Sequence, residues 1–224
     1  MTSLWATLLP IIIGSALVPV QILIAMLLLR SNAGRRTAVG YVGGLTVVRL
    51  LQGLIFGLIL SGGGSTSSDD HTTRTSIILL VLAILFLVSG ARSLMKHPDP
   101  DDPPPKWLTM TETVGPVGAF GFGVLTLVLA PKFWVFTLGA IAAIQAATLD
   151  RPIAIGVFLL FVLLAEGFQL AVVGLAFVAP AQSAAVLSVV GDWLKANNRI
   201  IMIVVSLVFG TWFLAKSLQG FGVL

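Results

Sequence analysis

Leu125-Thr-Leu-Val-Leu-Ala-Pro131-Lys132-Phe-Trp-Val-Phe136 is the stretch from which the fold follows. It lies at the centre of a nearly uncharged segment of about 30 residues (116–146), long enough to cross a bilayer. A lysine at the centre of a span costs about 2.5–3.5 kcal/mol on an insertion scale, and such charges are usually functional. Pro131 removes a backbone hydrogen bond at the same place. Because broken helices near the midplane often form transporter sites, the stretch predicts an interrupted span with a functional lysine.

The composition places the whole chain in the membrane. Of its 224 residues, 57% are hydrophobic and 10% are charged, against roughly 25% charged in a soluble domain. Too few polar residues remain for an aqueous domain. The absence of cysteine excludes disulfides and thiolate metal sites, and both histidines fall in expected loops. We therefore expect no metal and no cofactor. The basic residues are scattered at helix ends, which argues against a nucleic-acid partner.

Six apolar runs have the length of a membrane-spanning helix. They predict an all-α, polytopic membrane protein with a single transmembrane domain over residues 1–224. The runs are Leu4–Leu29, Ala38–Leu60, Ile77–Met95, Val117–Ala146, Ile153–Val178 and Ile200–Phe221.

Lysine and arginine are distributed unequally between the two sets of connections. The first, third and fifth connections carry three, three and two basic residues, whereas the opposite side carries Arg74, Arg151 and Lys216. Since basic residues concentrate on the cytoplasmic side, this distribution places both termini outside. The segment from Ala184 to Lys195 is mildly amphipathic, and either an interfacial helix or an ordinary polar loop fits it.

The two halves of the chain share a weak internal similarity that predicts an inverted repeat, an architecture common in transporters. Repeat one covers residues 1–95, a proline-rich cytoplasmic linker covers 96–113, and repeat two covers 114–224. The matched positions, in the same order in both halves, are Pro19 with Pro131, Arg49-x-x-Gln52 with Glu166-x-x-Gln169, Gly57-Leu58 with Gly174-Leu175, and Gly90 with Gly210.

This register predicts a polar site at the membrane midplane. Its candidate binding residues are Lys132, Arg49, Glu166, Gln21, Gln52, Gln169 and Trp134, with Pro19 and Pro131 as helix breaks. Pairing of Arg49 with Glu166 leaves Lys132 uncompensated, so the site favours an anion. Simpler interpretations stay open: a static ion pair that locks the repeats, hydrogen bonds between helices for the glutamines, and packing for Trp134. Paired glycines such as Gly40 and Gly44 favour close helix packing.

Motifs of soluble enzymes are missing from the sequence. It contains no Gly-x-Ser-x-Gly elbow, no phosphate-binding glycine loop and no His-Glu-x-x-His motif. The acidic residues Asp99, Asp101 and Asp102 alternate with prolines, as in a solvated linker. We therefore expect no enzymatic activity.

The chain resembles the L-lysine exporter (LysE) superfamily, and within it the actinobacterial GAP/Sap branch of glycopeptidolipid- and sulfolipid-addressing proteins. The resemblance rests on Pro19, the basic turn Arg30-Ser-Asn-Ala-Gly-Arg35-Arg36, Ala130-Pro131-Lys132-Phe-Trp, and the proline-rich acidic loop. Amino-acid exporters of the superfamily carry Pro-Gly-Pro and Asn-Pro-Lys elements, where this chain has Leu17-Val18-Pro19 and Ala130-Pro131-Lys132. The Glu-x-Gly-Asp motif of metal-ion relatives is also missing from the first and fourth expected helices, Leu4–Leu29 and Val117–Ala146.

The resemblance implies a multi-pass protein of the bacterial inner membrane that assists export of an anionic or glycosylated cell-envelope lipid. Two alternatives remain: a small-solute exporter of the amino-acid type, and a non-transporting scaffold for lipid-export machinery. The expected partners are membrane lipids, an anionic lipid or solute, and either further copies of the chain or lipid-export proteins.

Overall fold

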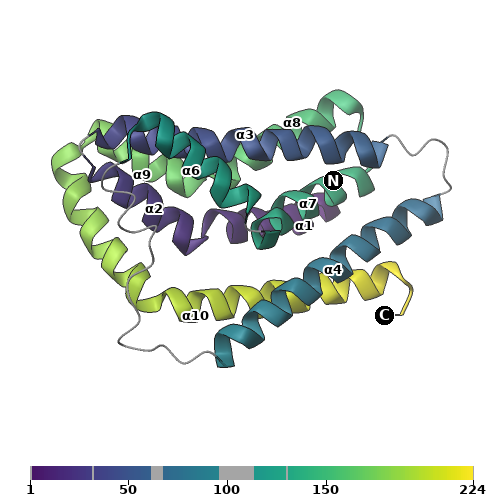
Figure 1. The fold of residues 1–224 in the computed structure, drawn as a ribbon. Coiled ribbons are helices and arrows are strands. Elements are labelled where there is room, and N and C mark those ends of the chain that lie inside the picture. Colours follow the sequence, from purple (N-terminus) through teal and green to yellow (C-terminus); the bar gives the residue numbers. More distant parts are fainter. Residues whose placement is uncertain (1, 32, 62–67, 96–113, 130, 224) are drawn as a thin grey trace.

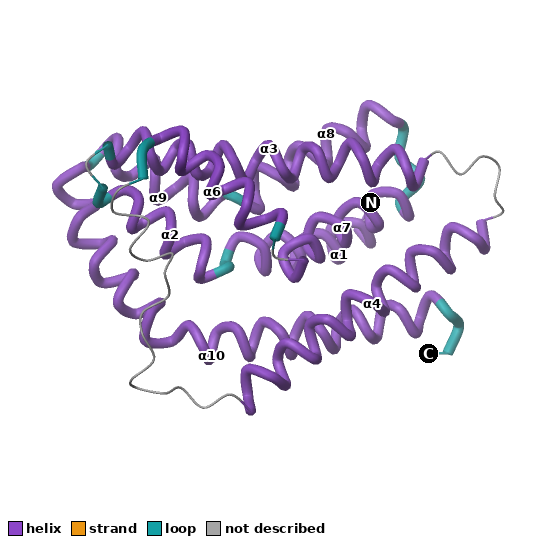
Figure 2. Tube along the Cα trace, viewed as in Figure 1, coloured by secondary structure: helices purple, strands orange, loops and turns teal. Residues whose placement is uncertain are grey.

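The computed structural model describes residues 2–31, 33–61, 68–95, 114–129 and 131–223. Within these ranges, nothing is described of the side chains of 2–3, 58–61, 68–75, 78, 131–132, 180–188, 195 and 198. The described chain is almost wholly helical and contains no strand (Figures 1 and 2), which confirms the predicted all-α class. The helices are α1 (Thr2–Ala16), α2 (Pro19–Leu29), α3 (Gly34–Ser61), α4 (Ser68–Met95), α6 (Pro116–Val128), α7 (Pro131–Ala146), α8 (Arg151–Ala165), α9 (Gly167–Val178) and α10 (Pro180–Gly220).

Three predicted spans are each built from two helices with a bend between them. The bend is 44° between α1 and α2, 69° between α6 and α7, and 58° between α8 and α9. Proline explains two of these breaks, because α2 begins at Pro19 and α7 begins at Pro131. A proline is favoured at the first helical position but cannot donate a hydrogen bond to the preceding turn. The third break lies at Glu166 and was not predicted from the sequence.

The helices fit a membrane protein by length and composition. In the described residues, Gly34–Gly57 of α3 and Arg199–Gly220 of α10 are continuous helices that are long and apolar enough to cross a bilayer. Counting each bent pair as one span raises the number to five, and the apolar segment Leu79–Met95 of α4 is shorter. The number of six membrane spans therefore remains a prediction.

The helices form an elongated bundle in which both chain termini lie at the same end (Figure 1). Helices α3 and α6 lie side by side at the top of this view, while α4 pairs with the second part of α10 at the bottom. The first part of α10 descends across the opposite end of the bundle. The α2–α3 turn and the junction of α9 with α10 are also at that opposite end.

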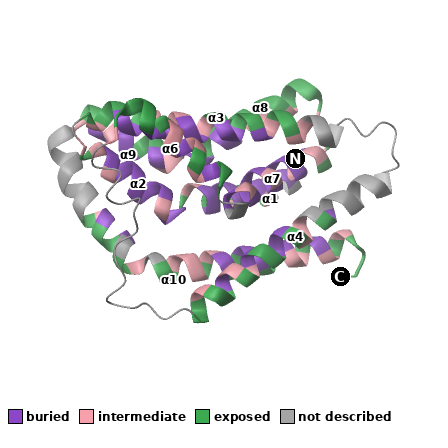
Figure 3. Ribbon diagram, viewed as in Figure 1, coloured by how far each residue is buried: buried purple, intermediate pink, exposed green. Residues whose placement is uncertain are grey.

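The core is apolar and rich in phenylalanine. The rings of Phe86, Phe136, Phe209 and Phe213 pack together with centroid separations of 5.6–6.3 Å, joining α4, α7 and α10. The outward faces are also apolar, as on α8, where the side chain of Leu163 is 56% exposed (Figure 3). Burial inside and an apolar surface outside are the pattern expected where lipid replaces water.

Glycines bring α3 and α6 into direct backbone contact. A Cβ atom at Gly44 would lie 2.2 Å from the carbonyl oxygen of Phe120, and one at Gly123 would lie 2.2 Å from that of Tyr41. Gly40 is equally constrained, 2.4 Å from the carbonyl oxygen of Pro116. The close packing predicted for Gly40 and Gly44 is therefore confirmed.

Other boundaries differ from the prediction. The connection expected from Pro180 to Arg199 is helical, because α10 begins at Pro180 and continues without a break to Gly220. A proline at the first turn starts a helix readily, and the segment has few residues that would stop one. Helix α4 begins at Ser68, inside the expected flexible loop. The proline-rich linker, 96–113, lies outside the described residues.

Candidate functional site

Arg49, on α3, is the largest of the fully buried side chains in the described part of the chain. Thr46, Arg49 and Gln52 follow one another at intervals of three residues, so they share one face of this helix. The interior of a bundle is the only place in a membrane where such a face is tolerated. Gln52 is 5% exposed and Arg49 is fully buried, so this polar face points inward.

The carboxylate that faces Arg49 comes from the bend between α8 and α9. Glu166 Oε1 lies 3.2 Å from Arg49 Nε, and both side chains are buried. Thr46 Oγ1 donates a hydrogen bond of 2.5 Å to Glu166 Oε2. The backbone of Glu166 has φ −100° and ψ 4°, outside the usual helical values. The residue that bends the helix is therefore also the residue that carries the buried acid.

A third helix joins the same group. Arg49 Nη1 donates a hydrogen bond of 3.3 Å to Thr137 Oγ1 of α7. One guanidinium therefore links α3 to α7 and to the α8–α9 bend. Sequence reasoning paired Arg49 with Glu166, as observed, but it missed Thr46 and Thr137. Thr46 could have been found from its position three residues before Arg49, whereas nothing local distinguishes Thr137.

The hydrogen bonds around this ion pair are incomplete. Arg49 Nε and Glu166 Oε1 are close enough for an ion pair, but neither atom makes a hydrogen bond in the described part of the chain. Thr46 Oγ1 also lies 2.9 Å from the carbonyl oxygen of Val42. A hydroxyl has one hydrogen, so Thr46 cannot donate to this carbonyl and to a carboxylate at the same time. The pair is thus close and buried but not fully bonded.

Two of the predicted glutamines meet across the bundle. Gln169 Nε2 of α9 donates a hydrogen bond of 3.3 Å to Gln21 Oε1 of α2, and both residues are fully buried. This is the interhelical hydrogen bond that the simpler interpretation expected. Within the described residues, Gln21 Nε2, Gln169 Oε1 and both polar atoms of Gln52 have no hydrogen-bond partner. Buried polar groups without partners are costly, so this region can accept a water or a polar ligand.

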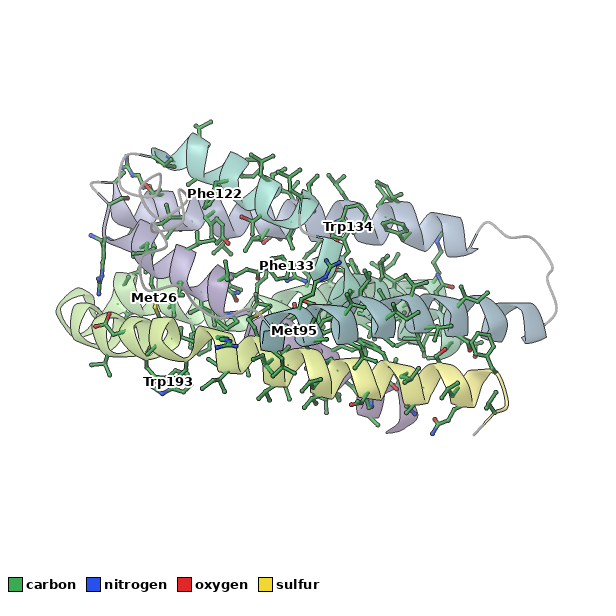
Figure 4. The ribbon with its side chains drawn as sticks, turned by 60° about the horizontal axis from the view of Figure 1, so that its bottom comes forward. Met26, Met95, Phe122, Phe133, Trp134 and Trp193 are labelled. Carbon is green, nitrogen blue, oxygen red and sulfur yellow. The ribbon has the colours of Figure 1, made fainter. Side chains whose placement is uncertain are left out.

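Trp134 completes the break between α6 and α7. Its side chain is labelled in Figure 4, and its Nε1 donates a hydrogen bond of 2.6 Å to the carbonyl oxygen of Leu127. In a continuous helix this carbonyl would accept from the residue four positions later, which is Pro131 and has no N–H. The indole of Trp134 takes that place. Its ring also packs edge-on against Phe56 at 6.0 Å, so the described contacts of Trp134 are structural.

The family model for Sap, sulfolipid-1-addressing protein, matches residues 8–219, which is nearly the whole chain. The chain belongs to the Sap family. This match confirms the resemblance to the GAP/Sap branch that the sequence motifs indicated. Comparisons with curated proteins and with solved structures found no match.

Membership of the Sap family indicates a lipid-related role for a chain that carries a buried polar site. The family description names a sulfolipid-addressing protein, and the apolar helices fit a membrane protein. Membership of the wider LysE superfamily stays a prediction.

The predicted cation Lys132 lies in the first turn of α7, and its side chain is outside the described residues. The backbone nevertheless places Lys132 on α7, five residues before Thr137, which accepts the hydrogen bond from Arg49 of α3. Arg49 and Glu166 alone are electrically balanced. The expected preference of this Sap-family site for an anion therefore depends on Lys132.

Proposed function

We propose that the chain transports an anionic or glycosylated lipid of the cell envelope across the bacterial inner membrane, without an enzymatic step. The observation that carries this proposal is the buried Arg49, which joins α3, α7 and the α8–α9 bend through Thr137 and Glu166. Charges inside a membrane protein are expensive and usually mark a transport pathway. Membership of the Sap family, whose description names a sulfolipid-addressing protein, supports a lipid as the transported molecule.

The proposed architecture has six membrane crossings arranged as two inverted three-helix repeats. Both termini lie at one end of the bundle, which is what an even number of crossings requires (Figure 1). The α1–α2 and α6–α7 pairs occupy equivalent positions in the two proposed repeats. In both pairs the second helix begins at a proline. These features support the repeat, and Arg49 and Glu166 then occupy equivalent positions in the two halves.

In the proposed mechanism, Glu166 alternates between pairing with Arg49 and carrying a proton. Protonated Glu166 would donate a hydrogen bond to Thr46 Oγ1, and Thr46 would then donate to the carbonyl oxygen of Val42. Both oxygens would thus accept a hydrogen bond. Arg49 would at that moment lose its counter-charge and become available to an anionic head group, together with Lys132. The bends at Pro19, Pro131 and Glu166 give the helices places at which to rearrange.

A deletion strain complemented with variants of the chain tests this proposal. We expect Glu166→Gln and Lys132→Ala to accumulate in the membrane but to reduce the target lipid at the cell surface by about tenfold or more, an effect of about 1.4 kcal/mol. The exposed cation Lys216 provides the matched control, Lys216→Gln. Lipid extracts of the cell surface, analysed by mass spectrometry, give the measurement.

The two alternative functions give different results in the same strain. A scaffold would tolerate both midplane variants and lose function when residues 98–105 are deleted. A small-solute exporter would leave surface lipids unchanged and alter the efflux of an amino acid. Full surface lipid with both folded midplane variants would show that the proposed site is wrong.

A further inference from the structure

A groove between α3 and α8 opens on the outer face of the bundle, beside the buried site. Its cavity volume is about 330 Å³, at the lower end of the roughly 300–1,000 Å³ typical of small-molecule sites. Figure 1 shows α3 and α8 alongside each other. The walls are largely apolar and accessible from outside: Leu54 is 59% exposed, Ile155 is 54% exposed and Leu159 is 50% exposed. A groove of this kind fits a hydrocarbon chain.

Glycine keeps the groove open. Gly57 lines it, and a Cβ atom at this position would meet no heavy atom within 4 Å. One turn earlier on α3, the space at Gly53 is filled by the ring of Phe158, 2.2 Å from the ideal Cβ position. The groove is therefore closed by an aromatic ring at Gly53 and open at Gly57.

One cation stands in the groove wall, at the first residue of α8. Arg151 is exposed, and no ion pair of its guanidinium is present among the residues described. The preceding Asp150 does not cap α8 with its side chain, so this side chain leaves the N–H groups of the helix start unoccupied. Arginine beside an apolar surface matches a lipid whose phosphate, sulfate or carboxylate head group lies at the edge of its tail.

The floor of the groove continues toward the buried ion pair. Ile141 of α7 lines the groove, and Thr137, which accepts a hydrogen bond from Arg49, lies one turn away on the same face. On the other wall, Leu50 is the immediate neighbour of Arg49 on α3. A lipid in the groove would thus lie one helix away from the proposed transport site.

We infer that the α3–α8 groove binds an anionic lipid, with a tail along Leu54 and Leu159 and its head group on Arg151. This inference rests on the proposed lipid-export function and adds to it a lateral site at the end of the bundle that holds both termini. Lipid binding in this groove differs from unspecific contact with the bilayer, because it requires both the negative charge of the head group and the open space at Gly57.

Native mass spectrometry of the full chain, released from nanodiscs with equal amounts of phosphatidylcholine and phosphatidylglycerol, tests the inference. We expect wild-type protein to retain phosphatidylglycerol several-fold over phosphatidylcholine. Arg151→Gln should abolish this preference, and Gly57→Leu should lower the amount of lipid retained. Size-exclusion profiles establish that the variants are folded.

Two matched controls separate the groove from the rest of the surface. Lys216→Gln removes another exposed cation from the same end of the bundle, near the end of α10, and Gly156→Leu fills open space on α8 outside the groove. Both should retain lipid as the wild type does. Wild-type retention by folded Arg151→Gln and Gly57→Leu, or equal loss in the controls, would overturn the inference.

The same assay distinguishes failure of the groove from failure of transport. Glu166→Gln should retain phosphatidylglycerol normally, because its side chain is not part of the groove, while it stops export. Normal binding with undiminished export in this variant would refute the transport site and leave the groove intact. Loss of export in Glu166→Gln together with normal lipid retention in both groove variants would refute the groove alone.

Discussion

At the scale of single residues, Arg49 and Glu166 depend on each other. A buried charge without its counter-ion is far more costly than a buried pair, and removing one partner typically costs about 3–5 kcal/mol. Here the pair is held by Thr46 and Thr137 but lacks an aligned bond between Arg49 Nε and Glu166 Oε1. The interaction therefore neutralises the two charges without fixing their geometry.

Replacing one member of the pair should destabilise the protein more than replacing both. We expect Arg49→Leu to lower the free energy of unfolding by about 3–5 kcal/mol, because Glu166 is left as an unpaired buried charge. The double variant Arg49→Leu/Glu166→Leu should recover most of that loss. Thermal unfolding in detergent measures both. A single variant as stable as the double variant would show that the charges are not coupled.

The indole of Trp134 gives a second prediction at this scale. Trp134→Phe keeps an aromatic ring beside Phe56 but removes the donor to the carbonyl of Leu127, a buried residue. An unsatisfied buried acceptor costs about 1–3 kcal/mol, so the unfolding temperature should fall. Trp212→Phe is the control, because Trp212 packs on Phe213. Equal effects of the two substitutions would argue against the role given to the indole N–H.

At the scale of helices, contact between backbones fixes α3 against α6. Gly44 and Gly43 are neighbours in the sequence but differ sharply in their surroundings. A Cβ atom at Gly44 would lie 2.2 Å from a backbone oxygen, whereas one at Gly43 would meet only the ring of Phe120, at 3.8 Å. Only the first position needs glycine for the helices to approach.

Alanine substitutions should reveal this difference. Gly44→Ala forces α3 and α6 apart, and overpacking of this kind costs about 1–3 kcal/mol. Gly43→Ala should leave the unfolding temperature in detergent unchanged or slightly raised. If Gly44→Ala is as stable as Gly43→Ala, the two helices do not pack as closely as described.

Much of this helical arrangement could be predicted from the sequence. Apolar length predicts the helices, and proline explains the starts of α2 and α7 at Pro19 and Pro131. The bend at Glu166 could not be predicted, since no proline is present and the conformation depends on contacts with α3. The sequence left Ala184–Lys195 open between an interfacial helix and a polar loop, because its composition is more polar than that of a span; the segment is helical and belongs to α10. The α3–α8 groove depends on tertiary packing and has no sequence signature.

At the scale of the whole molecule, the end of the bundle opposite the termini carries basic residues. At that end, Arg35 lies over the ring of Phe177 at 5.4 Å. Where α4 ends beside α10, short of that end in Figure 1, Arg199 donates hydrogen bonds of 3.1 Å to the carbonyl oxygens of Ser93 and Leu94. These contacts bring the α2–α3 turn to the end of α9, and the end of α4 to α10. Because basic residues favour the cytoplasm, this end should face inward.

Cysteine labelling can test this orientation directly, because the chain contains no cysteine. We expect Val223→Cys, near the C-terminus, to react with a membrane-impermeant maleimide on intact cells. Ala33→Cys, in the α2–α3 turn, should react only after the cells are opened. The reverse pattern would show that the termini are cytoplasmic.

The proposed function requires the buried Glu166 to enable a lipid to cross the membrane. Its most direct test is the transfer of fluorescent phosphatidylglycerol between leaflets of proteoliposomes, followed by chemical quenching of the outer leaflet. Wild-type protein should accelerate transfer at least about tenfold over protein-free vesicles, and folded Glu166→Gln should return it to the protein-free rate. Transfer by Glu166→Gln at the wild-type rate would contradict the claim.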